Sequence, residues 1–116
     1  MPALLKRAKE AITFTTIPSG EFAGSQIAEI FDTSGDTRMS CGIHEVSNAD
    51  VIVEVAPVDD VLYILEGEIE IEADGVRQTY HAGDFAYLRA GARQRYIVRD
   101  HVKHIYVCFP SNWKNG

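Results

Sequence analysis

The chain has 116 residues, of which 46% are hydrophobic and 24% are charged, and its formal net charge is -6. This length suits a single domain, and the composition is typical of a soluble globular protein rather than a disordered one. The negative charge, together with the lack of a zinc-finger, helix-turn-helix or RNP-like pattern, argues against nucleic acid as a partner.

Signals for membranes and for oxidising compartments are missing from the sequence. No apolar run approaches the ~20 residues needed to span a bilayer, and the first ten residues lack the apolar stretch of a secretory signal. The two cysteines, Cys41 and Cys108, lie far apart and belong to no CxxC pair, which argues against a disulfide framework or a zinc ribbon. We therefore expect a cytoplasmic protein with no membrane partner.

The N-terminal residues differ in pattern from the rest of the chain. Leu4, Ala8 and Ile12 are separated by charged residues, so residues 3–12 are predicted to form a short amphipathic helix. After this segment, β-branched and aromatic residues alternate with turn residues at the regular spacing of a β-sandwich or barrel. No repeat or linker interrupts the pattern, so we treat residues 1–116 as one all-β domain.

Two strand signals stand out in the middle of the chain. Strict alternation over residues 69–73 runs into Asp74-Gly75, which predicts a β-hairpin with a type I′ turn. Residues 51–55 and 61–65 are nearly continuous apolar runs, as in strands that are covered on both faces. A second copy of the chain is the expected cover, so we predict a homodimer.

The four histidines are interpreted as surface residues. His101 and His104 lie three positions apart, and residues at that spacing in a strand point to opposite faces. They could share a metal ion only if the chain bent between them. His44 and His81 have no partner nearby in the sequence.

Two segments resemble the conserved motifs of the cupin superfamily, whose metal-binding members hold one ion through three histidines and one glutamate. The first segment includes Asp60 to Gly67, and the second runs from Gly83 to Gly91. The resemblance implies a cupin double-stranded β-helix, an antiparallel barrel of the jelly-roll type, with its core motifs at about residues 42–113.

The metal ligands of these motifs are replaced in this chain. By position, Glu54 and Ala56 stand where the first two histidines belong, Asp60 stands at the glutamate and Gln94 at the third histidine. Asn48 takes the place of the opening glycine. Three oxygen-bearing side chains supply at most half of the roughly six ligands that a hard cation needs, and no imidazole is left for a transition metal. We expect no metal and no cofactor, with a metal site of atypical ligands as an alternative.

A closer resemblance links the chain to the EutQ-type cupins of ethanolamine utilisation. It rests on the ending Tyr106-Val-Cys-Phe-Pro-Ser-Asn-Trp113 and on Val58 to Gly67, although Val58 replaces a tyrosine of that family and Leu62 an aspartate. The resemblance implies a homodimer linked to bacterial microcompartments, and acetate kinase activity has been ascribed to the family. The sequence contains no GxxxxGK[ST] loop, and a shared fold does not decide the chemistry.

The motif positions nevertheless predict a polar pocket inside the barrel. We predict a metal-independent small-molecule site in which Glu54, Asp60 and Tyr96 carry any catalysis, while Gln94 and Trp113 contact the substrate. Two carboxyls that share a poorly hydrated site should titrate separately, with one held protonated. The alternative function is a non-catalytic accessory dimer whose vestigial pocket leaves these carboxylates facing water.

Overall fold

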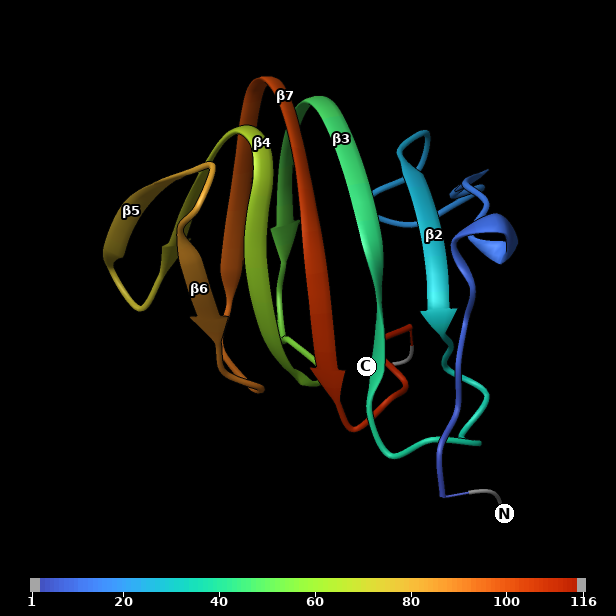
Figure 1. Ribbon diagram of the computed structural model, residues 1–116. Helices are drawn as coiled ribbons and strands as arrows, with labels where there is room; N and C mark the ends of the chain where they lie inside the picture. The colour runs from blue at the N-terminus through green and yellow to red at the C-terminus, as the bar shows by residue number, and fades with distance from the viewer. Residues whose placement is uncertain (1–2, 115–116) are drawn as a thin grey trace.

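The computed structural model describes residues 3–114, and nearly all of its regular structure is antiparallel sheet (Figure 1). The strands are β1 (Thr15–Thr16), β2 (Gln26–Phe31), β3 (Ser40–Val53), β4 (Asp59–Ala73), β5 (Val76–His81), β6 (Phe85–Leu88) and β7 (Gln94–Phe109). They are ordered β1-β2-β3-β7-β4-β5, and β6 pairs with β4. The predicted all-β architecture is confirmed. Within the described residues, no helix has the length and apolar character needed to cross a membrane.

Three long strands, rather than many short ones, form the framework. β3, β4 and β7 have 14, 15 and 16 residues, and the pairing with β7 slips between Ser47 and Ala49 in β3 and between Gly67 and Glu70 in β4. Asn48 and Gly67 lie at these slips with φ angles of 48° and 81°, a conformation best tolerated by glycine and asparagine. The strands curve over at this level, at the top of Figure 1, so that their two halves enclose an interior.

The register shift at Asn48 also changes which side chains of β3 face inward. Before it, His44 and Val46 are buried; after it, Val51 and Val53 take the inner positions while their neighbours are exposed. Asn48 alone lies opposite two residues of β7, and because a strand has a side-chain period of two, this shift moves the inward set of β3 from even to odd positions. This shift decides where the acidic residues at the end of β3 point.

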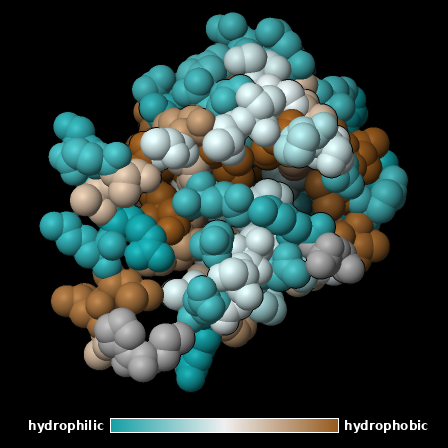
Figure 2. All heavy atoms as spheres, turned by 90° about the vertical axis from the view of Figure 1, so that its right-hand side faces the viewer, coloured by the Kyte–Doolittle hydropathy of each residue, from teal (hydrophilic) through white to brown (hydrophobic). Residues whose placement is uncertain are grey.

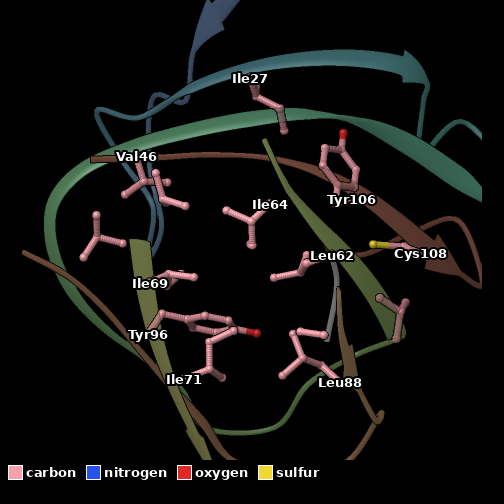
Figure 3. Close-up of a cluster of buried hydrophobic side chains, with 14 residues drawn as sticks. Ile27, Val46, Leu62, Ile64, Ile69, Ile71, Leu88, Tyr96, Tyr106 and Cys108 are labelled. Atoms are coloured by element: carbon pink, nitrogen blue, oxygen red, sulfur yellow. The ribbon is translucent and has the colours of Figure 1, made fainter. Parts of the chain in front are cut away.

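Apolar side chains from the two layers meet in one core, shown in Figure 3. Ile64 of β4 and Val102 of β7 have no exposed surface, and Ile69, Ile71 and Leu88 are at most 5% exposed. Full burial of a side chain of this size contributes roughly 1.5–3 kcal/mol. The core therefore holds the two halves of the bent strands together.

The predicted N-terminal helix over residues 3–12 is wrong. Only Lys9–Ala11 form a single 3-10 turn, without a side-chain cap and with no buried residue. Leu4, at the start of the expected apolar stripe, is 87% exposed. A helix this short is marginal unless its apolar side packs on the domain, and in this chain that side finds no docking surface.

The predicted hairpin is confirmed. β4 and β5 pair from Glu68 and His81 to Ala73 and Val76, and both turn residues, Asp74 and Gly75, have positive φ angles. Two successive positive φ angles are the property of the type I′ turn that favours Asp-Gly.

One face of the barrel is apolar and open to solvent. Strand 61–65 was expected to be covered on both sides, but within one chain only Leu62 and Ile64 are buried, and the residues between them face outward. The outer apolar face consists of Val61, Tyr63 and Leu65 of β4, Phe85 and Tyr87 of β6, and Ile105 and Val107 of β7. Phe85 is 68% exposed although its ring packs 4.6 Å from that of Tyr63.

The bend at Gly67 gives a test of the fold. A Cβ at this position would lie 1.9 Å from the backbone oxygen of His101, whereas a Cβ at Gly75, also at positive φ, would meet nothing within 4 Å. Gly75→Ala should therefore cost only the backbone strain of about 1–2 kcal/mol. Gly67→Ala must also displace backbone, so we expect at least about 3 kcal/mol of lost stability by urea unfolding. Equal losses in the two variants would contradict this account of the bend.

The outer apolar face gives a second test, of the expected homodimer. We expect a sedimentation mass of about twice 12.9 kDa for the wild-type chain. Phe85→Asp should give the single-chain mass, because it places a charge on this face. Val76→Asp, at another exposed apolar site on the β4–β5 hairpin and outside this face, should remain dimeric. A monomeric wild-type chain at micromolar concentration would show that this face has another role.

Candidate functional site

A cavity of about 570 Å³ lies inside the barrel. Its walls come from β2, β3, β4 and β7, and its rim from residues 15–22, 55–57 and 113–114. The volume is within the range usual for sites that bind small molecules. Figure 2 views the molecule from the side of β2 and the N-terminal segment, where hydrophobic residues show between hydrophilic ones.

Asp60 places a carboxyl group on the wall of this cavity. It lies on the inner side of β4 at its start, in register with Leu88 of β6 and Cys108 of β7. Its Oδ1 is buried and has no hydrogen-bond partner among the described residues. Burial raises the pKa of Asp60 to about 7, and the facing thiol of Cys108 only partly opposes this shift. The cause is burial and not a second carboxyl, whereas the sequence-based prediction had assumed a carboxyl pair.

Tyr96 and Gln94 lie beside each other on the inner face of β7. They are 7% and 3% exposed, and the Tyr96 hydroxyl donates a hydrogen bond to Gln94 Oε1. Gln94 in turn donates from Nε2 to the Arg89 carbonyl at 3.4 Å. Burial, and then the carboxyl of Asp60, raise the pKa of Tyr96 above its ordinary value. Figure 3 shows the hydroxyl pointing into the interior, so Tyr96 is a neutral hydroxyl oriented by Gln94.

Trp113 lines the cavity from the segment after β7. Ser40 Oγ donates to the Ser111 carbonyl at 2.7 Å and fixes this segment against β3. The indole of Trp113 packs edge-on against the ring of Tyr106, at 6.1 Å between centroids. Trp113 Nε1 and the Tyr106 hydroxyl are buried, and neither has a hydrogen-bond partner within the described part of the chain. Two residues of the cavity lining therefore carry unsatisfied polar groups.

Glu54 does not join this site. Its side chain is 76% exposed and faces Arg93, with 3.3 Å between Oε2 and Nε. It shares the outer side of β3 with Asp50, because the bulge at Asn48 has moved the inward positions to odd numbers. The expected acid–base pair of Glu54 and Asp60 is therefore corrected to a single interior carboxyl.

Two histidines that the sequence placed at the surface line the cavity instead. His44 and His104 are 8% and 6% exposed, lie opposite each other on β3 and β7, and have ring centroids 5.3 Å apart. Burial, and for His44 also its neighbour, lower the pKa of His44 to about 3; burial lowers that of His104 to about 4. Both rings are therefore neutral at physiological pH.

The hydrogen bonds of His44 define its tautomer. Ser25 Oγ donates to the Phe22 carbonyl at 2.6 Å, so its oxygen accepts the proton of His44 Nε2 at 2.7 Å. The Nδ1 atom of His44 then carries a lone pair. The Phe22 ring packs edge-on against both His44 and Tyr96 at the rim, with centroid distances of 5.2 and 5.5 Å.

The sequence did contain a signal for these histidines. Alternation places His104 on the same face as Tyr106 and Cys108, and His44 on the same face as Val46. The spacing argument correctly separated His101, which faces outward 3.6 Å from Glu45, from His104. The argument compared His101 and His104 only with each other and did not ask which of them shares a strand face with core residues. It therefore missed that the ring of His104 points inward.

The arrangement of strands is shared with known cupin structures. An RmlC-like cupin from Shewanella frigidimarina NCIMB 400 superposes with a TM-score of 0.73 over 91% of this chain and 90% of that chain, at 16% identity. The EutQ protein of Clostridium difficile gives a TM-score of 0.74 over 90% of this chain and 78% of that chain, at 18% identity. The fold and its interior cavity define a cupin barrel.

The family follows from the sequence comparison. Residues 11–115 match the family model described as ethanolamine utilisation protein EutQ. The chain belongs to the EutQ family. Acetate kinase EutQ of Clostridioides difficile (strain 630) is 24% identical over 85 residues, which make up 73% of this chain and 54% of that protein. The chain thus spans about half the length of the curated relatives it matches.

The residues present do not fit the metal ion of metal-binding cupins. Ala56 lines the cavity where a histidine would stand, and Glu54 faces solvent. Across residues 3–114, no three His, Cys, Asp or Glu side chains come together as a possible metal cluster. Cys108 does not supply a thiolate readily, because burial raises its pKa. The chemistry of the cavity is therefore argued from its own side chains.

The buried ionisable groups make stability depend on pH in opposite directions. Unfolded histidines take up protons near pH 6.5, whereas His44 and His104 do so only near 3 and 4, so stability falls as the pH falls below 6.5. Between pH 7 and pH 5, each histidine should lower the free energy of unfolding by roughly 2 kcal/mol. Asp60 takes up its proton near 7 when folded and near 3.8 when unfolded, which should return roughly 2 kcal/mol over the same interval.

We therefore expect urea unfolding to show a net loss of roughly 2 kcal/mol for the wild-type chain between pH 7 and pH 5. Asp60→Asn should lose about twice as much, because it lacks the opposing group, and it should be more stable than the wild-type chain at pH 8. Parallel pH profiles for the two proteins would mean that Asp60 titrates normally.

Proposed function

We propose that this chain binds a small polar metabolite of ethanolamine utilisation inside its barrel, without the help of a metal ion. The observation that carries this proposal is that three residues lining one cavity hold buried polar atoms without a hydrogen-bond partner among residues 3–114: Asp60 Oδ1, the Tyr106 hydroxyl and Trp113 Nε1. Native proteins leave few such atoms unsatisfied, and each costs about 1–3 kcal/mol. A bound molecule with matching groups recovers this free energy.

Asp60 also gives the site a capacity for acid–base chemistry. A carboxyl group that titrates near neutral pH can both donate and accept a proton under physiological conditions. Tyr96, whose hydroxyl is oriented by Gln94, supplies a neutral group beside it. The site is thus suited to hold a metabolite and, where the metabolite has an exchangeable proton, to transfer that proton.

The name acetate kinase belongs to the relatives, and the cavity offers little support for transferring that activity to this chain. Among the described lining residues the one permanent cation is Lys114, which is paired with Glu29 at 3.1 Å. Phosphoryl transfer requires several cationic groups or metal ions around the phosphates. We therefore propose binding of a metabolite rather than of a nucleoside triphosphate. The cytoplasmic location expected from the sequence stays a prediction.

The proposal is tested by thermal melting of the dimer or monomer as purified, against a library of small metabolites at millimolar concentration. A true ligand at 100 times its Kd should stabilise the chain by about 2.7 kcal/mol. Asp60→Asn and Tyr106→Phe should lose most of this response, whereas Glu54→Gln, which changes an exposed carboxylate outside the cavity, should keep it. A library without any hit, or a response that all three variants retain, would favour the accessory-protein alternative.

A further inference from the structure

The charges around the cavity are unbalanced. Its charged lining residues are Glu21, Glu29, Asp60 and Lys114. Lys114 is paired with Glu29, and its Nζ also lies 5.4 Å from the centre of the Trp113 ring. Glu21 at the rim and Asp60 in the interior are left without a cation from the described residues of the lining. An anion entering this space would lose its hydration without gaining a positive partner.

The hydrogen-bond acceptors of the interior also favour a ligand that donates hydrogen bonds. His44 presents the lone pair of Nδ1, because its other nitrogen donates to Ser25. Neither buried histidine is protonated at physiological pH, so neither serves as a cation. Asp60 Oδ1 is a second acceptor without a partner.

Aromatic rings form much of the remaining wall. Phe22, Tyr96, Tyr106 and Trp113 all line the cavity. The faces of such rings attract cations, most strongly where water is excluded. At the rim, Lys114 Nζ lies 5.4 Å from the centre of the Trp113 ring.

We propose that the ligand of this cavity carries a primary ammonium group that pairs with the Asp60 carboxylate, and an oxygen atom that accepts hydrogen bonds from Tyr106 or Trp113. This inference rests on the proposed function and specifies its ligand class as amino alcohols and related short amines. The carboxylate supplies the charge, and the two unpartnered donors supply the recognition of the oxygen. An ammonium group bonded to Asp60 Oδ1 satisfies an atom that the folded chain leaves without a partner.

The test compares probes that have nearly the same shape and differ in charge. One set is ethanolamine, ethylene glycol and glycolate, and a larger set is 3-aminopropan-1-ol, propane-1,3-diol and 3-hydroxypropionate. Calorimetric titration into the wild-type chain at pH 8 should give the amine of at least one set an affinity at least tenfold higher than its neutral and anionic counterparts. Asp60→Asn should reduce the affinity of that amine to the level of the neutral probe, and Glu54→Gln should leave it unchanged.

The outcomes separate this inference from the proposed function. Preference for the alcohol or the acid, amine binding that Asp60→Asn retains, or no binding by any of the six probes would overturn the ammonium assignment. The comparison of probes uses the wild-type chain, so it decides the question whether or not the variant folds. The proposed function itself is judged by the metabolite screen: a hit there without an amino group would keep the binding function while rejecting the ligand class.

Discussion

The concerted bend of β3, β4 and β7 is the constraint on which the site depends. Asn48 and Gly67 adopt positive φ angles where the pairing with β7 slips, and a side chain at Gly67 would collide with the His101 carbonyl. The strands fold back on themselves at this level and so enclose a space between their halves. Asp60, Tyr96 and the two histidines face the same cavity because they lie on the inner faces of these bent strands.

The cupin motifs combine two properties: glycines that shape the turns of the barrel, and side chains that bind a metal ion. This chain keeps only the first. The positions of the motif glycines keep their backbone role, since Gly83 and Gly91 also have positive φ angles and Asn48 replaces a glycine in such a conformation. The metal-binding side chains are gone, and Ala56 and Gln94 stand on the cavity wall in their place. A fold can therefore keep the turns that shape a barrel while its interior changes from ion coordination to hydrogen bonding and proton exchange.

The sequence predicted the elements that local chemistry determines. The Asp74-Gly75 hairpin, the all-β architecture and the inward direction of Gln94 and Tyr96 follow from turn preferences and from the side-chain period of two. The N-terminal helix was predicted wrongly because an amphipathic pattern gives no information on whether a docking surface exists. Glu54 was misplaced because its inward direction was taken from its position in the cupin motif, whereas the register shift between β3 and β7 at Asn48 turns the even-numbered positions that follow outward.

The buried histidines show a related limit. The surface interpretation considered the spacing of His101 and His104 along the chain, but the pairing of β3 with β7 brings His44 and His104 face to face. The charge of the two histidines depends on their burial and not on their spacing. Their burial results from the packing of β3 against β7, which neither segment specifies alone. The raised pKa of Asp60 has the same origin.

The proposed site depends most directly on the protonation state of the Asp60 carboxyl group. Carbon-13 NMR of the side-chain carboxyl carbons, with Asp60→Asn used to assign the resonance, reports the midpoint of Asp60 without any ligand. The structure predicts a midpoint near 7, as expected for a carboxyl group buried on the wall of the cavity. A midpoint near 3.8, the ordinary value for an aspartate, would show that Asp60 is well hydrated and would contradict the proposed site.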